Sequence, residues 1–246
     1  MSAPTPPLLE IERLQKSFGG LVAARELSFT VESGTILGLI GPNGSGKTTV
    51  LNLITGELRS DGGDMRLRGE SLLGMSPYQI CRRQVSRTFQ LVRILPGMTA
   101  MENVMVGRLF GSRPTDRRAA LGEAEELLRR VGLAEKRDMR AAQLTYVDQK
   151  RLEIARALAT RPVLLLLDEW LAGLNPTELR IGMDLVHRIR EGGVTVILVE
   201  HVMHAVRSLC DRVVVMDAGS KVVEGLPDEV LAHPDVVRAY LGDSGA

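Results

Sequence analysis

The segment GPNGSGKTT, residues 41–49, has the residue types and spacing to hold a polyphosphate. It fits the pattern G-x-x-x-x-G-K-[ST] and lies between the apolar run TILGLI and a helical pattern that begins near Gly46. Glycines let the backbone approach an anion closely, and free N–H groups at a helix N-terminus attract its charge. We expect Lys47 to reach the β and γ phosphates and Thr48 to hold Mg²⁺. The predicted phosphate-binding residues are Gly41, Pro42, Asn43, Gly44, Ser45, Gly46, Lys47, Thr48 and Thr49.

Two consecutive acids, Asp168 and Glu169, end the apolar run VLLLLDE, which has the composition of a buried strand. In enzymes with this kind of phosphate loop, the strand-end Asp orients Mg²⁺ or a water bound to it. The following carboxylate is placed to polarise an attacking water. A plain strand followed by an acidic turn is the structural alternative, and the phosphate loop disfavours it. The two motifs together predict hydrolysis of a nucleotide.

The composition is that of a globular protein with a sizeable core, since 44% of the 246 residues are hydrophobic and 25% are charged. This length fits one large domain, or a core with a smaller subdomain. Aromatic residues make up 3% and the formal net charge is +1, which argues against a nucleic-acid partner. The two cysteines, Cys81 and Cys210, lack metal-binding spacing, so a reducing cytosolic compartment is the simpler interpretation.

We expect this chain to contain neither a signal peptide nor a membrane span. MSAPTPP at the N-terminus has the composition of a short flexible lead-in. The longest apolar runs, VLLLL and VTVILV, are far too short to span a bilayer. If the protein works at a membrane, another chain must supply the crossing.

Strand-like segments alternate with helical patterns along the chain. This alternation predicts an α/β fold with a mostly parallel sheet and helices on its faces. The stretch of about 91–160 has mostly helical patterns and predicts a helical insertion. We expect strands at LLEIERLQKSF, ELSFTVE, TILGLIG, DMRLRG, VLLLLDE, TVILVEH and RVVVMDAG. We expect helices from Gly46 to about Thr55 and in RRAALGEAEELLRRVGL, QKRLEIARALAT and TELRIGMDLVHRIREGG.

Further motifs resemble those of the ATP-binding subunits of ABC transporters. Gln90, in SRTFQ, matches the glutamine of that family's Q-loop, and LTYVDQKRLEIARAL stands where the family has its signature loop and following helix. LAGLNP, residues 171–176, follows the acidic pair as the D-loop does. His201, at the end of VTVILVEH, matches the switch histidine, and Phe18, in KSFGG, resembles the aromatic that stacks on adenine. For the last two residues, a purely structural role is the alternative.

The resemblance covers nearly the whole chain and implies a P-loop NTPase core of the RecA-like type. It adds an N-terminal antiparallel β subdomain and a helical insertion to the mostly parallel sheet. It implies one ATPase domain over residues 1–246, with the α/β core at about 1–90 and 161–225. The helical subdomain then covers about 91–160, and a helical tail covers 226–246.

The resemblance also implies the mechanism, in which two such subunits face each other head to tail. Each ATP lies between one subunit's phosphate loop and the other's signature loop, where Thr145 stands in this chain. Glu169 is the expected general base, and His201 and Gln90 align the water and the γ phosphate. Thr48, Gln90 and Asp168 are the expected Mg²⁺ residues. The implied partners are transmembrane permease subunits, a second ATP-binding subunit and, indirectly, a solute-binding protein outside the cell.

Within the family, several segments look most like the subunits of branched-chain amino acid importers: RTFQ, MTAMENVMVG, RLEIARAL, AGLNP and EGLPDEVLAHPDVVRAYLG. The expected location is the cytoplasmic face of a bacterial or archaeal plasma membrane. Related importers of urea, amides or other small solutes are one alternative, and an ATP-gated regulatory module with little turnover is another. A soluble relative acting on ribosomes or DNA is disfavoured, because tandem cassettes, long insertions and basic extensions are missing.

The chain departs from the family pattern in its signature loop and its D-loop. Val147 and Asp148 replace the usual glycine and glutamine, and Trp170 replaces the usual proline. Val is stiff and bulky where glycine lets a phosphate approach, and Asp148 adds a negative charge at a helix N-terminus. Thr145 and Asp148 also resemble a capping box. We hypothesise an asymmetric heterodimer in which the site using LTYVD turns ATP over slowly; the alternative is that both sites work.

Overall fold

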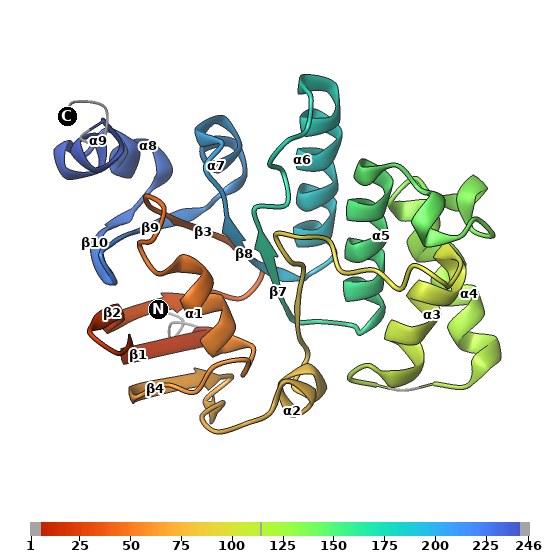
Figure 1. The fold of residues 1–246 in the computed structure, drawn as a ribbon, viewed down its shortest axis with the longest axis horizontal. Helices are drawn as coiled ribbons and strands as arrows, with labels where there is room; N and C mark the ends of the chain where they lie inside the picture. The colour runs from red at the N-terminus through yellow and green to blue at the C-terminus, as the bar shows by residue number, and fades with distance from the viewer. Residues whose placement is uncertain (1–5, 114, 242–246) are drawn as a thin grey trace, which may run out of the picture.

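The computed structural model describes residues 6–113 and 115–241, which form two β-sheets and a set of surrounding helices (Figure 1). The smaller sheet has the order β2-β1-β4-β5, and its strands are paired antiparallel. It is the N-terminal antiparallel subdomain that the resemblance implies. Its strands are β1 (Leu9–Phe18), β2 (Leu21–Val31), β4 (Gly62–Leu67) and β5 (Glu70–Ser71).

The larger sheet has the order β10-β9-β3-β8-β7-β6. The pairs from β9 to β6 are parallel, and β10 joins the edge antiparallel to β9. The predicted mixed α/β class with a mostly parallel sheet is therefore confirmed. The strands are β3 (Ile36–Ile40), β6 (Val85–Arg87), β7 (Leu164–Asp168), β8 (Thr195–Val199), β9 (Arg212–Asp217) and β10 (Ser220–Gly225).

The three central strands β3, β7 and β8 are buried along their whole length, as expected for continuous apolar runs in a parallel sheet. Successive side chains point to opposite faces, so each strand feeds two apolar clusters. Leu165 and Leu167 join a cluster with residues of helices α5 (Tyr146–Ala159) and α6 (Pro176–Glu191). Leu164 and Leu166 join the cluster shared with helix α1 (Lys47–Ile54) and the small sheet. This double burial fixes β7, and with it the acidic pair at its end.

Helices cover both faces of the large sheet, and further helices lie beyond one side of it (Figure 1). In Figure 1, α3 and α4 lie at one end of the molecule, and α5 stands between them and α6. The helices are α1 (Lys47–Ile54), α2 (Pro77–Arg82), α3 (Ala100–Phe110), α4 (Arg117–Arg130), α5 (Tyr146–Ala159), α6 (Pro176–Glu191), α7 (Met203–Leu209), α8 (Pro227–Leu231) and α9 (Pro234–Leu241), with 3₁₀ turns η1 (Ala134–Lys136) and η2 (Ala141–Gln143). Among the residues described, none of the helices combines the length and apolar character needed to cross a bilayer.

Several element boundaries differ from the sequence-based prediction. Helix α5 begins at Tyr146 rather than Gln149, because Thr145 caps it by accepting the Asp148 N–H. Strand β2 begins at Leu21, where a hairpin continues from β1. Strands β6 and β10 were missed, because both are short and partly polar. Between 91 and 160 the described residues form helices but no strand of either sheet, and the domain boundaries themselves stay a prediction.

Candidate functional site

The phosphate loop connects β3 to α1, and its backbone requires glycine. Gly46 is the residue before α1 and has φ of 105°, in the left-handed region. A Cβ on Gly46 would collide with the carbonyl oxygen of Ala23, and one on Gly41 would collide with that of Met216. The loop therefore fits closely against β2 and β9, and its first and last glycines cannot be replaced without displacing main chain.

Lys47 is folded back over this loop. Its ammonium group donates to the carbonyl oxygens of Gly41 at 2.8 Å and Pro42 at 2.9 Å. Burial lowers the pKa of Lys47, while the nearby carboxylates of Glu169 and Asp168 act in the opposite direction. The lysine is thus a cation that binds two carbonyls of the loop and is attracted by the acidic end of β7.

A pocket of about 440 Å³ opens beside the loop. Nine predicted residues line it, and they come from the phosphate loop, β1, the segment after β6 and the end of β7. Leu21 and Ala23 of β2 also line it and were missed, although Leu21 pairs with Phe18 across the hairpin. The predicted residues in the lining are Phe18, Asn43, Gly44, Gly46, Lys47, Thr48, Thr49, Gln90 and Glu169.

Glu169 and Gln90, two of the lining residues, are hydrogen-bonded to each other. The amide nitrogen of Gln90 donates to Oε2 of Glu169 at 2.9 Å. Glu169 has φ of 49°, a left-handed conformation that is uncommon outside glycine, and its N–H donates to the carbonyl of Val199 at 2.9 Å. Strain of this kind persists only where neighbours hold the backbone firmly. The side chain of Glu169 is therefore aimed by its backbone as well as by Gln90.

Asp168 is not among the residues that line the pocket, and one of its carboxylate oxygens is paired with Arg87. The guanidinium Nη2 of Arg87 lies 2.7 Å from Oδ2 of Asp168, and both side chains are at least 95% buried. Nη1 donates to the Asn52 side chain at 2.5 Å, and Nη1 lies 4.0 Å from a Glu57 oxygen. Nε is buried without a hydrogen-bond partner among the described residues. Arg87 belongs to the segment RTFQ, but the sequence alone did not predict it as the partner of Asp168.

His201 and Thr145 also lie outside the pocket lining. His201 follows β8, whose Val199 is paired with Asp168, so the histidine sits at the same carboxyl edge of the sheet but is exposed. Thr145 is exposed at the start of α5. The remaining predicted residues outside the lining, Gly41, Pro42 and Ser45, form the base of the phosphate loop. The roles of all these residues stay predictions.

The altered signature loop is an ordinary helix start. Val147 lies within α5 and does not need a positive φ, so the substitution strains no backbone. Asp148 is buried and lies 2.5 Å from Lys136 and 3.4 Å from Arg151. Its N–H donates to Thr145, but its carboxylate does not return the bond, so the predicted capping box is only half formed. The charge expected to repel a phosphate is instead paired within the chain.

A second buried acid, Glu200, directly follows β8 and contacts the segment that follows β7. It is 1% exposed, and its Oε1 accepts the N–H of Leu171 at 2.6 Å. Burial raises the pKa of Glu200 to about 7; the backbone N–H groups of Leu171 and His201 act against this rise, Glu169 adds to it and Lys150 opposes it. Sequence reasoning did not single out Glu200, because VEH reads as the plain end of a strand.

Comparisons with known proteins agree with this geometry. The family model described as "ABC transporter" matches residues 24–172. The chain belongs to the ATP-binding subunits of ABC transporters. It is 42% identical to the high-affinity branched-chain amino acid transport ATP-binding protein LivG of Salmonella typhimurium, over 97% of this chain and 99% of that protein. BraF of Pseudomonas aeruginosa, which carries the same description, is also 42% identical with the same coverage.

Solved structures show the same relationship. The crystal structure of the ADP conformation of an ATP-binding cassette of an ABC transporter superposes with a TM-score of 0.88 at 30% identity, over 97% of this chain and 100% of that one. A second family model, described as "Branched-chain amino acid ATP-binding cassette transporter", matches residues 220–246. This ABC subunit is accordingly an ATPase whose hydrolysis of ATP is coupled to transport through permease partners.

The residues present fit a magnesium-bound triphosphate. The phosphate loop offers backbone N–H groups and one cation, and a Cβ built on Gly44 would meet only open space. Thr48 is exposed, and the nitrogen of the Gln90 amide binds Glu169 while its oxygen has no hydrogen-bond partner among the described residues. The pair with Arg87 uses Oδ2 of Asp168, so within the described part of the chain Oδ1 is left for a metal. Oxygen donors of these types are those that Mg²⁺ prefers.

The Arg87–Asp168 pair gives a prediction about stability. Replacing Arg87 with Met leaves a buried carboxylate without its partner, which costs about 3–5 kcal/mol of unfolding free energy. The matched control is Arg129→Met, since Arg129 forms an exposed pair with Glu126 and its loss costs less than about 1 kcal/mol. Urea unfolding measures both. An equal loss of unfolding free energy in the two variants would contradict the view that Arg87 compensates a buried charge on Asp168.

Glu200 gives a prediction about pH. Its pKa is about 7 in the folded chain against an ordinary value of 4.5, so the folded state holds the proton more tightly. The stability contributed by this group is complete below pH 4.5 and is lost as the pH rises through 7. As the pH rises from 5 to 8, the unfolding free energy of Glu200→Gln is therefore expected to increase by about 2–3 kcal/mol relative to that of the wild type. Urea unfolding of both proteins at the two pH values checks this, and a constant difference would refute it.

Proposed function

We propose that this chain is the ATP-hydrolysing subunit of an importer for branched-chain amino acids, at the cytoplasmic face of a bacterial or archaeal plasma membrane. The observation that carries the solute class is the match of residues 220–246 to the "Branched-chain amino acid ATP-binding cassette transporter" model. LivG and BraF, both described as branched-chain amino acid transport proteins, support it over 97% of the chain. A solute-binding protein outside the cell is the indirect partner in this proposal.

The pocket beside the phosphate loop holds MgATP in this proposal. Phe18, which is 46% exposed at the pocket rim, stacks on the adenine, and Lys47 binds the terminal phosphates. Thr48, Gln90 and Asp168 would hold Mg²⁺, which would supply positive charge beside the phosphates. Glu169 takes a proton from the attacking water, and its hydrogen bond to Gln90 keeps it in place in the pocket lining.

His201 completes this site after a small movement of the segment that follows β8. It belongs to the same sheet edge as Glu169, because Val199 pairs with Asp168. We assign it to the γ phosphate of the bound ATP. Thr145 faces the ATP held by a second subunit, which agrees with its exposed place at the start of α5 and its absence from the pocket lining. These groups act by positioning and electrostatics.

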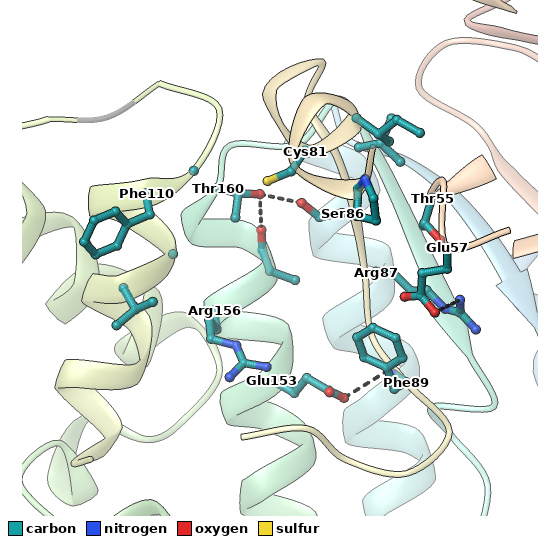
Figure 2. A pocket seen from close by; sticks show the side chains of 17 residues that line it. Thr55, Glu57, Cys81, Ser86, Arg87, Phe89, Phe110, Glu153, Arg156 and Thr160 are labelled. Atoms are coloured by element: carbon teal, nitrogen blue, oxygen red, sulfur yellow. Dashed lines mark hydrogen bonds and ion pairs between the residues drawn. The ribbon is translucent and has the colours of Figure 1, made fainter. Parts of the chain in front are cut away.

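The permease docks, in this proposal, in a groove of about 330 Å³ between the α/β core and the helical part (Figure 2). The groove contains Phe89, the neighbour of Gln90, so an occupant reaches the loop that binds Glu169. Phe110, 70% exposed, borders its other side, and Leu91 is 80% exposed just beyond Gln90. Such large exposed apolar side chains around a mixed apolar and charged groove suit a short helix of a partner protein.

The two ATP sites of the working pair are unequal in this proposal. Val147 places a branched side chain where glycine would admit a phosphate, and Asp148 is occupied with Lys136 and Arg151. A partner's ATP therefore meets fewer donors at LTYVD than at a glycine-containing loop. The second ATP-binding subunit is then a different chain with an intact signature loop, and the transporter has one fast site and one slow site.

The general base is tested by Glu169→Gln in the assembled transporter. We expect ATP still to bind, because the phosphate loop is unchanged, and kcat to fall about a hundredfold or more, because the proton acceptor is lost. Glu178→Gln, in the first turn of α6, is the control and is expected to keep wild-type turnover, because glutamine can still accept the N–H of Asn175 in the helix cap. Stimulation of the wild-type ATPase by a binding protein loaded with leucine, isoleucine or valine, but not with urea or an amide, tests the solute class.

The unequal sites are tested by restoring the usual residues with Val147→Gly and Asp148→Gln together. Single-turnover experiments then count the ATP molecules hydrolysed quickly per transporter. We expect about one in the wild type and about two in the double variant, since the restored loop supplies the missing contacts. An unchanged rate and count would show that both sites already work, and absence of turnover in both would favour a regulatory module.

A further inference from the structure

A lysine from α5 binds the backbone of residues 170–172, where the D-loop begins. Lys150 donates from its ammonium group to the carbonyl oxygen of Trp170 at 2.9 Å and to that of Ala172 at 2.7 Å. Trp170 returns the contact, because its indole N–H donates to the carbonyl oxygen of Lys150 at 3.1 Å. Two side chains therefore bind each other's backbone, and α5 is tied to the segment that directly follows Glu169.

Two further elements hold the same segment. Glu200, after β8, accepts the N–H of Leu171, the residue between the two carbonyls that Lys150 binds. On α6, Gly182 leaves room for the Trp170 ring; a Cβ there would come within 3.0 Å of the ring and 2.8 Å of Leu171. The backbone of residues 170–172 is thus fixed from α5, β8 and α6 together, an arrangement that we name the D-loop clamp.

Lys150 is a buried cation, and burying a charged group costs free energy. Lys150 is 3% exposed, and burial lowers its pKa, while Glu200, Glu153 and Glu169 act in the opposite direction. A buried cation is kept only where charge and hydrogen bonds compensate it. Here the compensation comes from the carbonyl oxygens of Trp170 and Ala172 and from the ring of Tyr146, whose centroid is 5.1 Å from the ammonium nitrogen. The buried cation is therefore bound to the backbone at the start of the D-loop.

The clamp bears on Glu169, which immediately precedes it. Glu169 has φ of 49° and is held through its own N–H to Val199 and through Gln90. Neither contact holds the backbone that follows Glu169. The clamp does so, because it binds two carbonyls and one N–H of residues 170–172. The uncommon conformation of Glu169 is thereby constrained at both ends.

We propose that Lys150 is a positioning residue for Glu169 and that it joins this catalytic glutamate to the signature loop of the same chain. The proposal rests on the proposed ATPase role of Glu169. Lys150 lies in the second turn of α5, whose first residues belong to LTYVD. A shift of that loop against a partner's ATP moves Lys150 and, through the two carbonyls, the D-loop. Each subunit's base is then aligned according to the state of the opposite ATP site.

The test uses Lys150→Met and Lys150→Arg in the assembled transporter, with Lys221→Met on the exposed strand β10 as the matched control. We expect Lys150→Met to lower kcat roughly tenfold to a hundredfold, as misplacement of a catalytic group does, with KM for ATP changed less than about threefold. Lys150→Arg keeps a cation and its donors and is expected to restore most of kcat. An unchanged kcat, or a rise in KM alone, would overturn the proposal.

Trp170 gives a readout that does not depend on turnover, since it is the single tryptophan of the chain. In the purified full chain without nucleotide, we expect Lys150→Met to shift Trp170 emission to longer wavelength and to increase quenching by acrylamide, while Lys221→Met leaves both unchanged. Glu200→Gln, which keeps an acceptor for Leu171, is expected to show a smaller change. If Trp170 in Lys150→Met has the same emission and quenching as in the wild type, the clamp is disproved. If the wild-type transporter shows no ATPase activity, only the proposed function is disproved.

Discussion

The carboxyl end of β7 carries two adjacent carboxylates in a mostly buried setting, and the surrounding structure provides each with a different partner. Asp168 is neutralised by the guanidinium of Arg87, whereas Glu169 accepts a hydrogen bond from the neutral amide of Gln90. Like charges so close together resist burial unless they are compensated. Burial of β7 on both faces fixes their position, and Lys47 approaches from the phosphate loop. The pocket beside the phosphate loop reaches this edge through Glu169.

Helix α5 connects the parts that must respond to ATP. Its first residues form the LTYVD loop, and Lys150 in its second turn reaches the D-loop. One turn further on, Glu153 accepts the N–H of Arg93 at 2.8 Å and that of Phe89 at 3.4 Å. Burial raises the pKa of Glu153, and these N–H groups oppose the rise. A single rigid helix thus holds the signature loop, the segment on both sides of Gln90, and the backbone beside Glu169.

Much of the site follows from sequence, because its motifs carry local geometry with them. The phosphate loop, Glu169 and Gln90 were predicted from spacing and resemblance, and the structure brings them to one pocket. Arg87, Lys150 and Glu200 were not predicted as partners, because each acts on main chain or on a buried charge far away in sequence. Their residue types fit a strand end or a helix equally well. Likewise, the sequence predicts a negative charge at Asp148 but not its partner Lys136, which lies outside the motif.

The central claim is that one connected set of contacts runs from the LTYVD loop through Lys150 to Glu169 and the nucleotide pocket. The most direct measurement is a structure of the assembled Glu169→Gln transporter with MgATP. The account predicts the γ phosphate of one ATP against Lys47 and Gln90 of this chain, with Lys150 still bound to the carbonyls of Trp170 and Ala172. A γ phosphate placed elsewhere, or a Lys150 withdrawn from both carbonyls in the ATP-bound state, would contradict it.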